Sequence, residues 1–300
     1  MTGPDLPPPD LLDIPGLGAD GLAAVLDLAE RRDLGRPLQG AGVALLFEKP
    51  SLRTRNSMEM AAASLGGHPV HIARDEVGLG GRETAADIAR ALACYHRVIA
   101  ARVFDHRVLE AMAAATDAPM VNMLSDRAHP LQALADLLTL RQLFGALRGL
   151  RVAYVGDANN VCRSLAAACA LAGVELAIAS PEGHGLEPEE AAGLDGVRQL
   201  ADPAEAVRGA RAVYTDIWTS MGQEEEASAR RELFRAYQVD GALMARAADD
   251  AWFLHCLPAH RGEEVAAAVI DGPRSAVWRQ AENRMWSARG ALAWIARGGR

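Results

Sequence analysis

The chain has 300 residues, of which 50% are hydrophobic and 23% are charged, and its formal net charge is -8. This length favours two domains or one large α/β domain. The negative charge argues against a general nucleic-acid or anionic-membrane binder, and no apolar run reaches the length of a membrane span. The 4 cysteines show neither CxxC nor zinc-finger spacing and no signal peptide is recognisable, so we expect reduced thiols in a cytoplasmic protein.

Apolar runs alternate with amphipathic stretches through the first half of the chain. Strands that alternate with helices of this length predict a parallel sheet covered on both faces. In chain order we expect a strand at Val43–Phe47, helices at Thr54–Leu65 and from Thr84 to Cys94, a strand at Val98–Ala101, a helix at Val108–Ala115, a strand at Pro119–Met123 and a helix at Leu131–Phe144.

The same alternation restarts in the second half. The expected elements are strands at Val152–Val155, Glu175–Ala179, Ala212–Tyr214 and Phe253–His255, a helix at Asn160–Leu171 and a last helix at Glu282–Ala296. The sequence therefore predicts an α/β protein with two doubly wound parallel-sheet domains, residues 1–145 and 146–280, and an active-site cleft between them. We expect the C-terminal helix, residues 281–300, to pack back on the first domain.

The segment Phe47–Arg55 lies where a strand gives way to a helix. Free backbone N–H groups and the helix dipole favour an anion at such a start. Ser51 and Thr54 add hydroxyl groups, and Arg53 adds a planar fork that suits phosphate oxygens. Taken alone, the segment is equally consistent with a capped helix that carries surface arginines.

A second strand-to-helix junction is found in Asp126–Asp136. His129 and Gln132 are three residues apart across the helix start, so both side chains can face one cleft. An imidazole there could donate a hydrogen bond to a carbonyl oxygen as negative charge develops. By itself, a His-Pro pair in a loop is usually only a turn.

Two further polar loops, Asp216–Glu224 and His255–Glu264, each follow a predicted strand of the second domain. Parallel sheets bind ligands at the carboxyl ends of their strands, which places both loops on the ligand side. An acidic residue with a nearby serine suits the ammonium and carboxylate groups of an amino acid. Each loop alone could also be a plain strand-to-loop transition.

Together these segments resemble the aspartate/ornithine transcarbamylase family, in order from Gly40 to Leu292. The matching elements are Ser51–Arg55, similar to the family's Ser-Thr-Arg-Thr-Arg loop; His129–Gln132, similar to its His-Pro-x-Gln element; Asp216 with Ser220–Gly222 and His255–Pro258, similar to its ornithine-specific branch; and Gly156–Asn160 and Glu282–Arg284. The resemblance implies transfer of a carbamoyl group from carbamoyl phosphate to the δ-amine of L-ornithine, giving citrulline in arginine metabolism. It also implies a homotrimer, with no metal and no organic cofactor.

The resemblance also assigns site residues, position by position. The carbamoyl phosphate site would comprise Ser51, Leu52, Arg53, Thr54, Arg102, His129, Gln132, Cys256, Leu257 and Arg284, of which Arg102, His129, Cys256 and Arg284 would be catalytic. The ornithine site would comprise Asn160, Asp216, Ser220 and Met221. Two positions depart from the family pattern. Leu52 replaces a threonine, and Asp75 falls where a loop donated by a neighbouring subunit often has glutamine.

Other classes of protein fit the sequence less well. A nucleotide enzyme would need GxGxxG or GxxxxGK[ST] after Val155, and neither occurs. A metal hydrolase using His129, His255 and Cys256 lacks HExxH or paired spacing, and direct amine attack needs no thiol nucleophile. A non-catalytic member that binds the same ligands remains the alternative class. Among acceptors, aspartate, acylated ornithine and putrescine each fit less well than ornithine, whereas lysine differs by one methylene.

Overall fold

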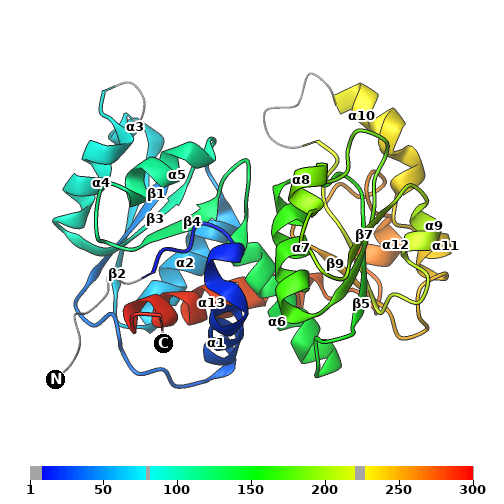
Figure 1. Cartoon of the computed structure of the whole chain (residues 1–300), viewed down its shortest axis with the longest axis horizontal. Helices are drawn as coiled ribbons and strands as arrows, with labels where there is room; N and C mark the ends of the chain where they lie inside the picture. The colour runs from blue at the N-terminus through cyan, green and yellow to red at the C-terminus, as the bar shows by residue number, and fades with distance from the viewer. Residues whose placement is uncertain (1–8, 79–81, 220–226, 300) are drawn as a thin grey trace. The chain divides into compact units, whose positions relative to one another are not determined.

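The computed structural model describes residues 9–78, 82–219 and 227–299, and its chain divides into two compact units (Figure 1). Unit 1 comprises Met1–Leu138 and Asn283–Arg300, and unit 2 comprises Thr139–Glu282. The chain passes from one unit to the other within α6 (Pro130–Phe144) and again within α13 (Val277–Ala296). No helix in the described ranges is both long and apolar enough to cross a membrane.

Unit 1 is built on a parallel sheet whose strand order is β2-β1-β3-β4. The strands are β1 (Gly42–Phe47), β2 (His68–Ala73), β3 (His96–Arg102) and β4 (Met120–Leu124). The helices of this unit that precede α6 are α1 (Gly18–Glu30), α2 (Leu52–Ser64), α3 (Arg74–Val77), α4 (Ala85–Ala93) and α5 (His106–Ala113). The two central strands, β1 and β3, are almost wholly buried because helices cover both faces of the sheet.

Unit 2 holds a parallel sheet of order β7-β6-β5-β8-β9. The strands are β5 (Arg151–Val155), β6 (Glu175–Ala179), β7 (Val197–Leu200), β8 (Ala212–Thr215) and β9 (Trp252–His255). The helices are α7 (Asn160–Ala172), α8 (Pro188–Ala191), α9 (Pro203–Ala206), α10 (Ala227–Phe234), α11 (Gly241–Met244) and α12 (Ala267–Ile270). The predicted fold class, two α/β domains with parallel sheets, is confirmed.

Two strands were not expected from the sequence, and both lie at a sheet edge. β2 reads His-Pro-Val-His-Ile-Ala and has no fully buried residue, and β7 reads Val-Arg-Gln-Leu with its two central residues exposed. An edge strand is less covered by neighbouring strands and helices than an inner strand, so it needs no continuous apolar run. The hydrophobic signal that revealed the inner strands was therefore absent from these two.

The last helix begins five residues earlier than the sequence predicted, at Val277 rather than Glu282. Within unit 1, its C-terminal part packs closely on α1. A Cβ atom at Gly290 would lie 2.6 Å from the carbonyl oxygen of Val25 and 2.9 Å from the amide nitrogen of Ala29. Only glycine allows the two backbones to approach this closely. The close packing fixes the position of the stretch of α13 that carries Arg284.

Candidate active site

The turn between β1 and α2 forms a well-capped helix start. Ser51 has an extended backbone, and its Oγ accepts a hydrogen bond from the Thr54 amide at 3.3 Å. This is the usual role of serine at an N-cap, and it leaves other first-turn amides free for an anion. Arg53 is partly buried at this start, whereas the Leu52 side chain is 77% exposed.

Two arginines from distant segments meet at the hydroxyl group of Thr54, which is itself buried. Arg102, the last residue of β3, donates from Nη1 to Thr54 Oγ1 at 3.4 Å, and Arg284 of α13 donates from Nη2 to the same oxygen at 3.2 Å. Arg284 Nη1 also donates to Gln132 Oε1 at 2.6 Å, and Gln132 Nε2 donates to Asp136 Oδ1 at 2.8 Å. We call Thr54, Arg102, Gln132 and Arg284 the arginine network. It concentrates positive charge at the predicted phosphate site.

His129 lies immediately before α6 and is 4% exposed. Burial lowers the pKa of its imidazole well below the ordinary value of 6.5, and the positive charges of Arg284, Arg102 and Lys49 lower that pKa further. The imidazole is therefore neutral at pH 7. A neutral imidazole carries one N–H donor and can stabilise a developing oxyanion without adding a charge to the ground state.

In unit 2, Asp216 follows β8 and is 5% exposed. Its Oδ2 accepts from Asn159 Nδ2 at 2.8 Å, and its Oδ1 accepts from the Ile217 amide at 2.8 Å and from Cys256 Sγ at 2.9 Å. These three donors are all neutral. In the described part of the chain, Asp216 has no arginine, lysine or histidine within ion-pair distance. Burying a charged carboxylate costs free energy unless a cation forms an ion pair with it, so a cationic ligand would complete the site.

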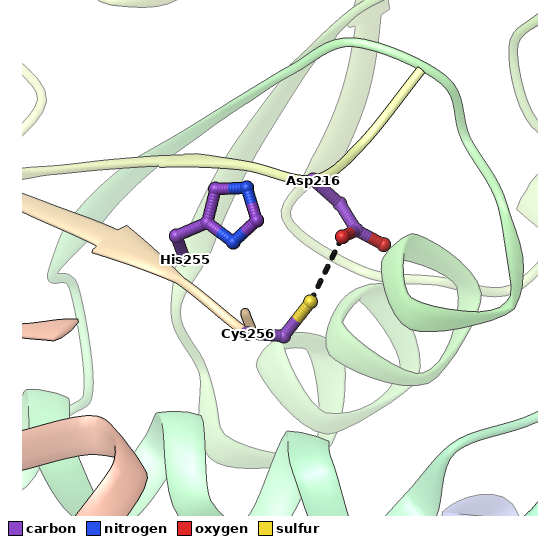
Figure 2. A group of neighbouring side chains, drawn as sticks. All are labelled: Asp216, His255 and Cys256. Atoms are coloured by element: carbon purple, nitrogen blue, oxygen red, sulfur yellow. Dashed lines mark hydrogen bonds between the residues drawn. The ribbon is translucent and has the colours of Figure 1, made fainter. Parts of the chain in front are cut away.

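His255, the last residue of β9, lies beside Asp216 and Cys256 (Figure 2), and its ring nitrogens hold the loop that follows the strand. The Leu257 amide donates to His255 Nδ1 at 2.8 Å, so Nδ1 accepts and carries no proton. The other ring nitrogen, Nε2, lies 3.3 Å from Glu264 Oε1. Leu257 has a φ of 60°, a conformation that few non-glycine residues adopt. The buried His255–Glu264 pair therefore supports the backbone that presents Cys256 and Leu257.

Asp216, His255 and Cys256 bring three metal-binding atom types within 4.8 Å of one another. Their hydrogen bonds make this a poor metal site, because a metal ion would have to displace them. The Cys256 thiol proton is donated to Asp216, and both ring nitrogens of His255 are already engaged. The group is better understood as a hydrogen-bonded support for the loop (Figure 2).

Ser220 and Met221 lie outside the described residues, so their predicted contacts with ornithine have no structural description. Asn160 is the first residue of α7, and Asp75 lies exposed in α3. Sequence analysis assigns no role to Asn159, although this residue caps α7 through Val161 and Cys162 and also donates to Asp216. The sequence did hold one signal for Asn159, because this residue lies within Gly156–Asn160, a segment that resembles the family.

Comparison with known proteins identifies the family of this chain. The model of the aspartate/ornithine carbamoyltransferase carbamoyl-P binding domain matches residues 10–142, and that of the Asp/Orn binding domain matches residues 148–295. The chain is 50% identical over 295 residues to the ornithine carbamoyltransferase of Thermus thermophilus, covering 95% of this chain and 96% of that protein.

Solved structures agree with the sequence match. The crystal structure of ornithine carbamoyltransferase from Thermus thermophilus has a TM-score of 0.89 at 47% identity and covers 98% of this chain and 99% of that chain. The ornithine carbamoyltransferase from Pyrococcus furiosus has a TM-score of 0.93 at 42% identity, with the same coverage. This chain therefore belongs to the aspartate/ornithine carbamoyltransferase family.

Proposed function

We infer that this protein is an ornithine carbamoyltransferase, which transfers the carbamoyl group of carbamoyl phosphate to the δ-amine of L-ornithine and releases L-citrulline and phosphate. The observation that carries the inference is the 50% identity to a named ornithine carbamoyltransferase along 95% of this chain. The arginine network supports a dianionic phosphate donor, and the buried Asp216 carboxylate supports a cationic acceptor.

Carbamoyl phosphate binds at the start of α2 in this proposal. The phosphate group is held by Ser51, by Arg53 and by the backbone amides of the first turn of α2, including the amide of Leu52. Arg102, Thr54 and His129 donate to the carbamoyl oxygen, while Gln132 and Arg284 complete the surroundings of the donor. Removing one donor that stabilises an oxyanion typically lowers kcat about 10²–10³-fold, so this part of the site supplies a large share of the rate.

Ornithine binds through its α-substituents. Asp216 pairs with the α-ammonium, and Asn160, Ser220 and the Met221 amide receive the α-carboxylate. The δ-amine lies beside Cys256 and Leu257. This assignment explains why Asp216 is buried with neutral donors only, since the substrate supplies the missing cation.

The transfer itself is an addition followed by an elimination. The neutral δ-amine attacks the carbonyl carbon of carbamoyl phosphate, and the electron pair of the C=O bond moves to oxygen. Collapse of this intermediate breaks the C–O bond to phosphate, and the departing phosphate accepts the proton that the amine loses. Because the enzyme binds donor and acceptor together, a bimolecular encounter becomes a reaction within one complex. This can lower the activation free energy by up to roughly 7–11 kcal/mol.

The setting of the enzyme follows from the same proposal. We propose a homotrimer in the cytoplasm that acts in arginine metabolism, in either the synthetic or the catabolic direction. Light scattering coupled to size-exclusion chromatography measures the assembly directly.

An acceptor panel tests the proposed function. Ornithine, acetylornithine, lysine, putrescine and aspartate are each supplied with carbamoyl phosphate, and release of phosphate and formation of the ureido product are both measured. We expect ornithine to give the highest kcat/KM, with lysine within about 10–200-fold of it because one methylene discriminates weakly. Faster reaction with aspartate or acetylornithine would exclude the ornithine assignment.

Leu52 provides a separate prediction about the donor. Its side chain is exposed at the start of α2, so replacing it should not disturb the core. Leu52→Thr adds the hydroxyl group found at this position in the family, and one hydrogen bond contributes about 0.5–1.5 kcal/mol. We expect the KM for carbamoyl phosphate to fall by up to about tenfold. Leu52→Val has the shape of threonine without the hydroxyl and is the matched control. Equal KM values for the two variants would show that the hydroxyl is not used.

A further inference from the structure

Lysine occurs once in this chain. Lysine and arginine together number 31, and Lys49 is the only lysine among them. An arginine side chain stays protonated in proteins, whereas a lysine side chain can lose its proton and act as a nucleophile. The only side-chain amine of the protein thus lies in the turn between β1 and α2, two residues before Ser51.

The Lys49 amine is partly withdrawn from water. Its Nζ lies 4.7 Å from the centroid of the Phe104 ring and the side chain is partly buried. In the described ranges its amine has neither a hydrogen bond nor an ion pair. The positive charge of Arg102 lowers the pKa of this amine, whereas the negative charges of Asp126 and Glu48 raise it. The Glu48 carboxylate is engaged with the Phe104 amide at 2.8 Å.

Burial lowers the pKa of the Lys49 amine from 10.5 to about 8, and the charge of Arg102 contributes to the shift. At pH 8 about half of the molecules then carry a neutral amine, compared with less than about 1% for an ordinary lysine. Desolvation beside another cationic group is a recognised way to activate a lysine nucleophile. Lys49 also contributes to lowering the pKa of His129, so the amine belongs to the same group of charges as the donor site.

We propose that Lys49 is a covalent modification site, at which carbamoyl phosphate bound to the enzyme carbamoylates Nζ when no acceptor amine is present. The proposal rests on the proposed function, which supplies carbamoyl phosphate. The lone pair of Nζ forms a bond to the carbonyl carbon, the C–O bond to phosphate breaks, and phosphate leaves with the proton lost from Nζ. The product is a neutral carbamoyl-lysine, so the modification removes a positive charge from the donor site. Slow self-inactivation follows, against which ornithine protects.

Mass spectrometry of protein with this 300-residue sequence tests this directly, because Lys49 is its one side-chain amine and the α-amine of the expressed chain serves as an internal reference. An unperturbed α-amine has a pKa of about 7.7–8.0, so this group reports carbamoylation by cyanate released into solution. The enzyme is incubated with carbamoyl phosphate or with cyanate, and carbamoylation of both amines is followed by peptide mapping. The ratio of Lys49 to α-amine modification should be about tenfold or more higher with carbamoyl phosphate than with cyanate, as expected for an oriented bound donor.

Three controls sharpen the result. Added ornithine should suppress Lys49 modification while leaving the α-amine unchanged, and Arg53→Ala should suppress it with carbamoyl phosphate but not with cyanate. Lys49→Arg should keep its own starting activity during incubation with carbamoyl phosphate, whereas the unaltered enzyme loses activity. The rate should rise with pH and level off above about pH 8, since the neutral amine is the nucleophile.

Equal ratios with the two reagents, or modification that ornithine does not suppress, would overturn the proposal. Failure of the proposed function would look different, because no citrulline would then form from ornithine and carbamoyl phosphate.

Discussion

Replacing Arg102 by methionine is expected to lower kcat about 10²–10³-fold, the usual cost of losing one donor to a developing oxyanion. Arg102 is 6% exposed at the end of β3, and its guanidinium reaches Thr54 within the arginine network. Methionine fills a similar volume and removes the charge and the donors. Steady-state kinetics with ornithine saturating and carbamoyl phosphate varied measure the effect.

Thermal unfolding separates this loss of function from a loss of structure. Arg102 lies close enough to Lys49 to lower its pKa, so the fold holds like charges near one another, and removing one of them should leave Tm unchanged or raise it. Arg97→Met is the matched control, because Arg97 lies in the same strand but is exposed and donates to Pro37 and Ala296 carbonyls. A kcat of Arg102→Met within threefold of the starting enzyme would remove Arg102 from the chemistry.

Asp216→Asn should lower kcat/KM for ornithine by roughly 30-fold or more, since losing a charged partner in a desolvated site costs about 2–5 kcal/mol. Asparagine keeps the shape, and its Oδ1 can still accept from Cys256 and from the Ile217 amide. Its NH2 group replaces the oxygen that accepts from Asn159, so thermal unfolding is measured beside the kinetics to separate any loss of stability. Binding of carbamoyl phosphate, measured by calorimetry, should barely change, because the residues proposed to hold its phosphate belong to unit 1.

The second substrate in this experiment is putrescine, which lacks both α-substituents. Activity toward putrescine should be nearly unaffected by Asp216→Asn if the carboxylate serves only to recognise the α-ammonium. Equal losses toward ornithine and putrescine would assign Asp216 to the chemistry or to the fold. Asp240→Asn is the matched control: Asp240 caps α11 through the Leu243 amide at 2.8 Å, and its loss should change stability rather than kcat/KM.

Sequence reasoning was strongest where a strand ends and a polar loop begins. The junctions at Ser51, His129 and Asp216 each combine a buried apolar run with hydrogen-bonding residues, and local sequence records both features. The same reasoning failed for β2 and β7, because an edge strand carries little hydrophobic signal.

Long-range partners could not be derived from spacing. Arg284 donates to Gln132, 152 positions earlier, and to Thr54, 230 positions earlier, and the fold alone creates these contacts. The family resemblance predicts that Arg284 lies near carbamoyl phosphate. It does not predict that Arg284 and Arg102 donate to the same hydroxyl group, that of Thr54. That Lys49 is the single lysine among 31 lysine and arginine residues is visible in the sequence, but the partial burial that lowers the pKa of its amine is not.

The most direct test of the central claim is to observe the bond that the enzyme is proposed to form. Carbamoyl phosphate labelled with ¹³C is incubated with ornithine labelled with ¹⁵N at the δ-amine, and the carbonyl region is followed by ¹³C NMR. We predict a new ureido carbonyl signal split by a one-bond coupling to ¹⁵N, appearing at the rate of phosphate release. Phosphate release without that coupled signal, or coupling only when the α-amine carries the label, would contradict the assignment.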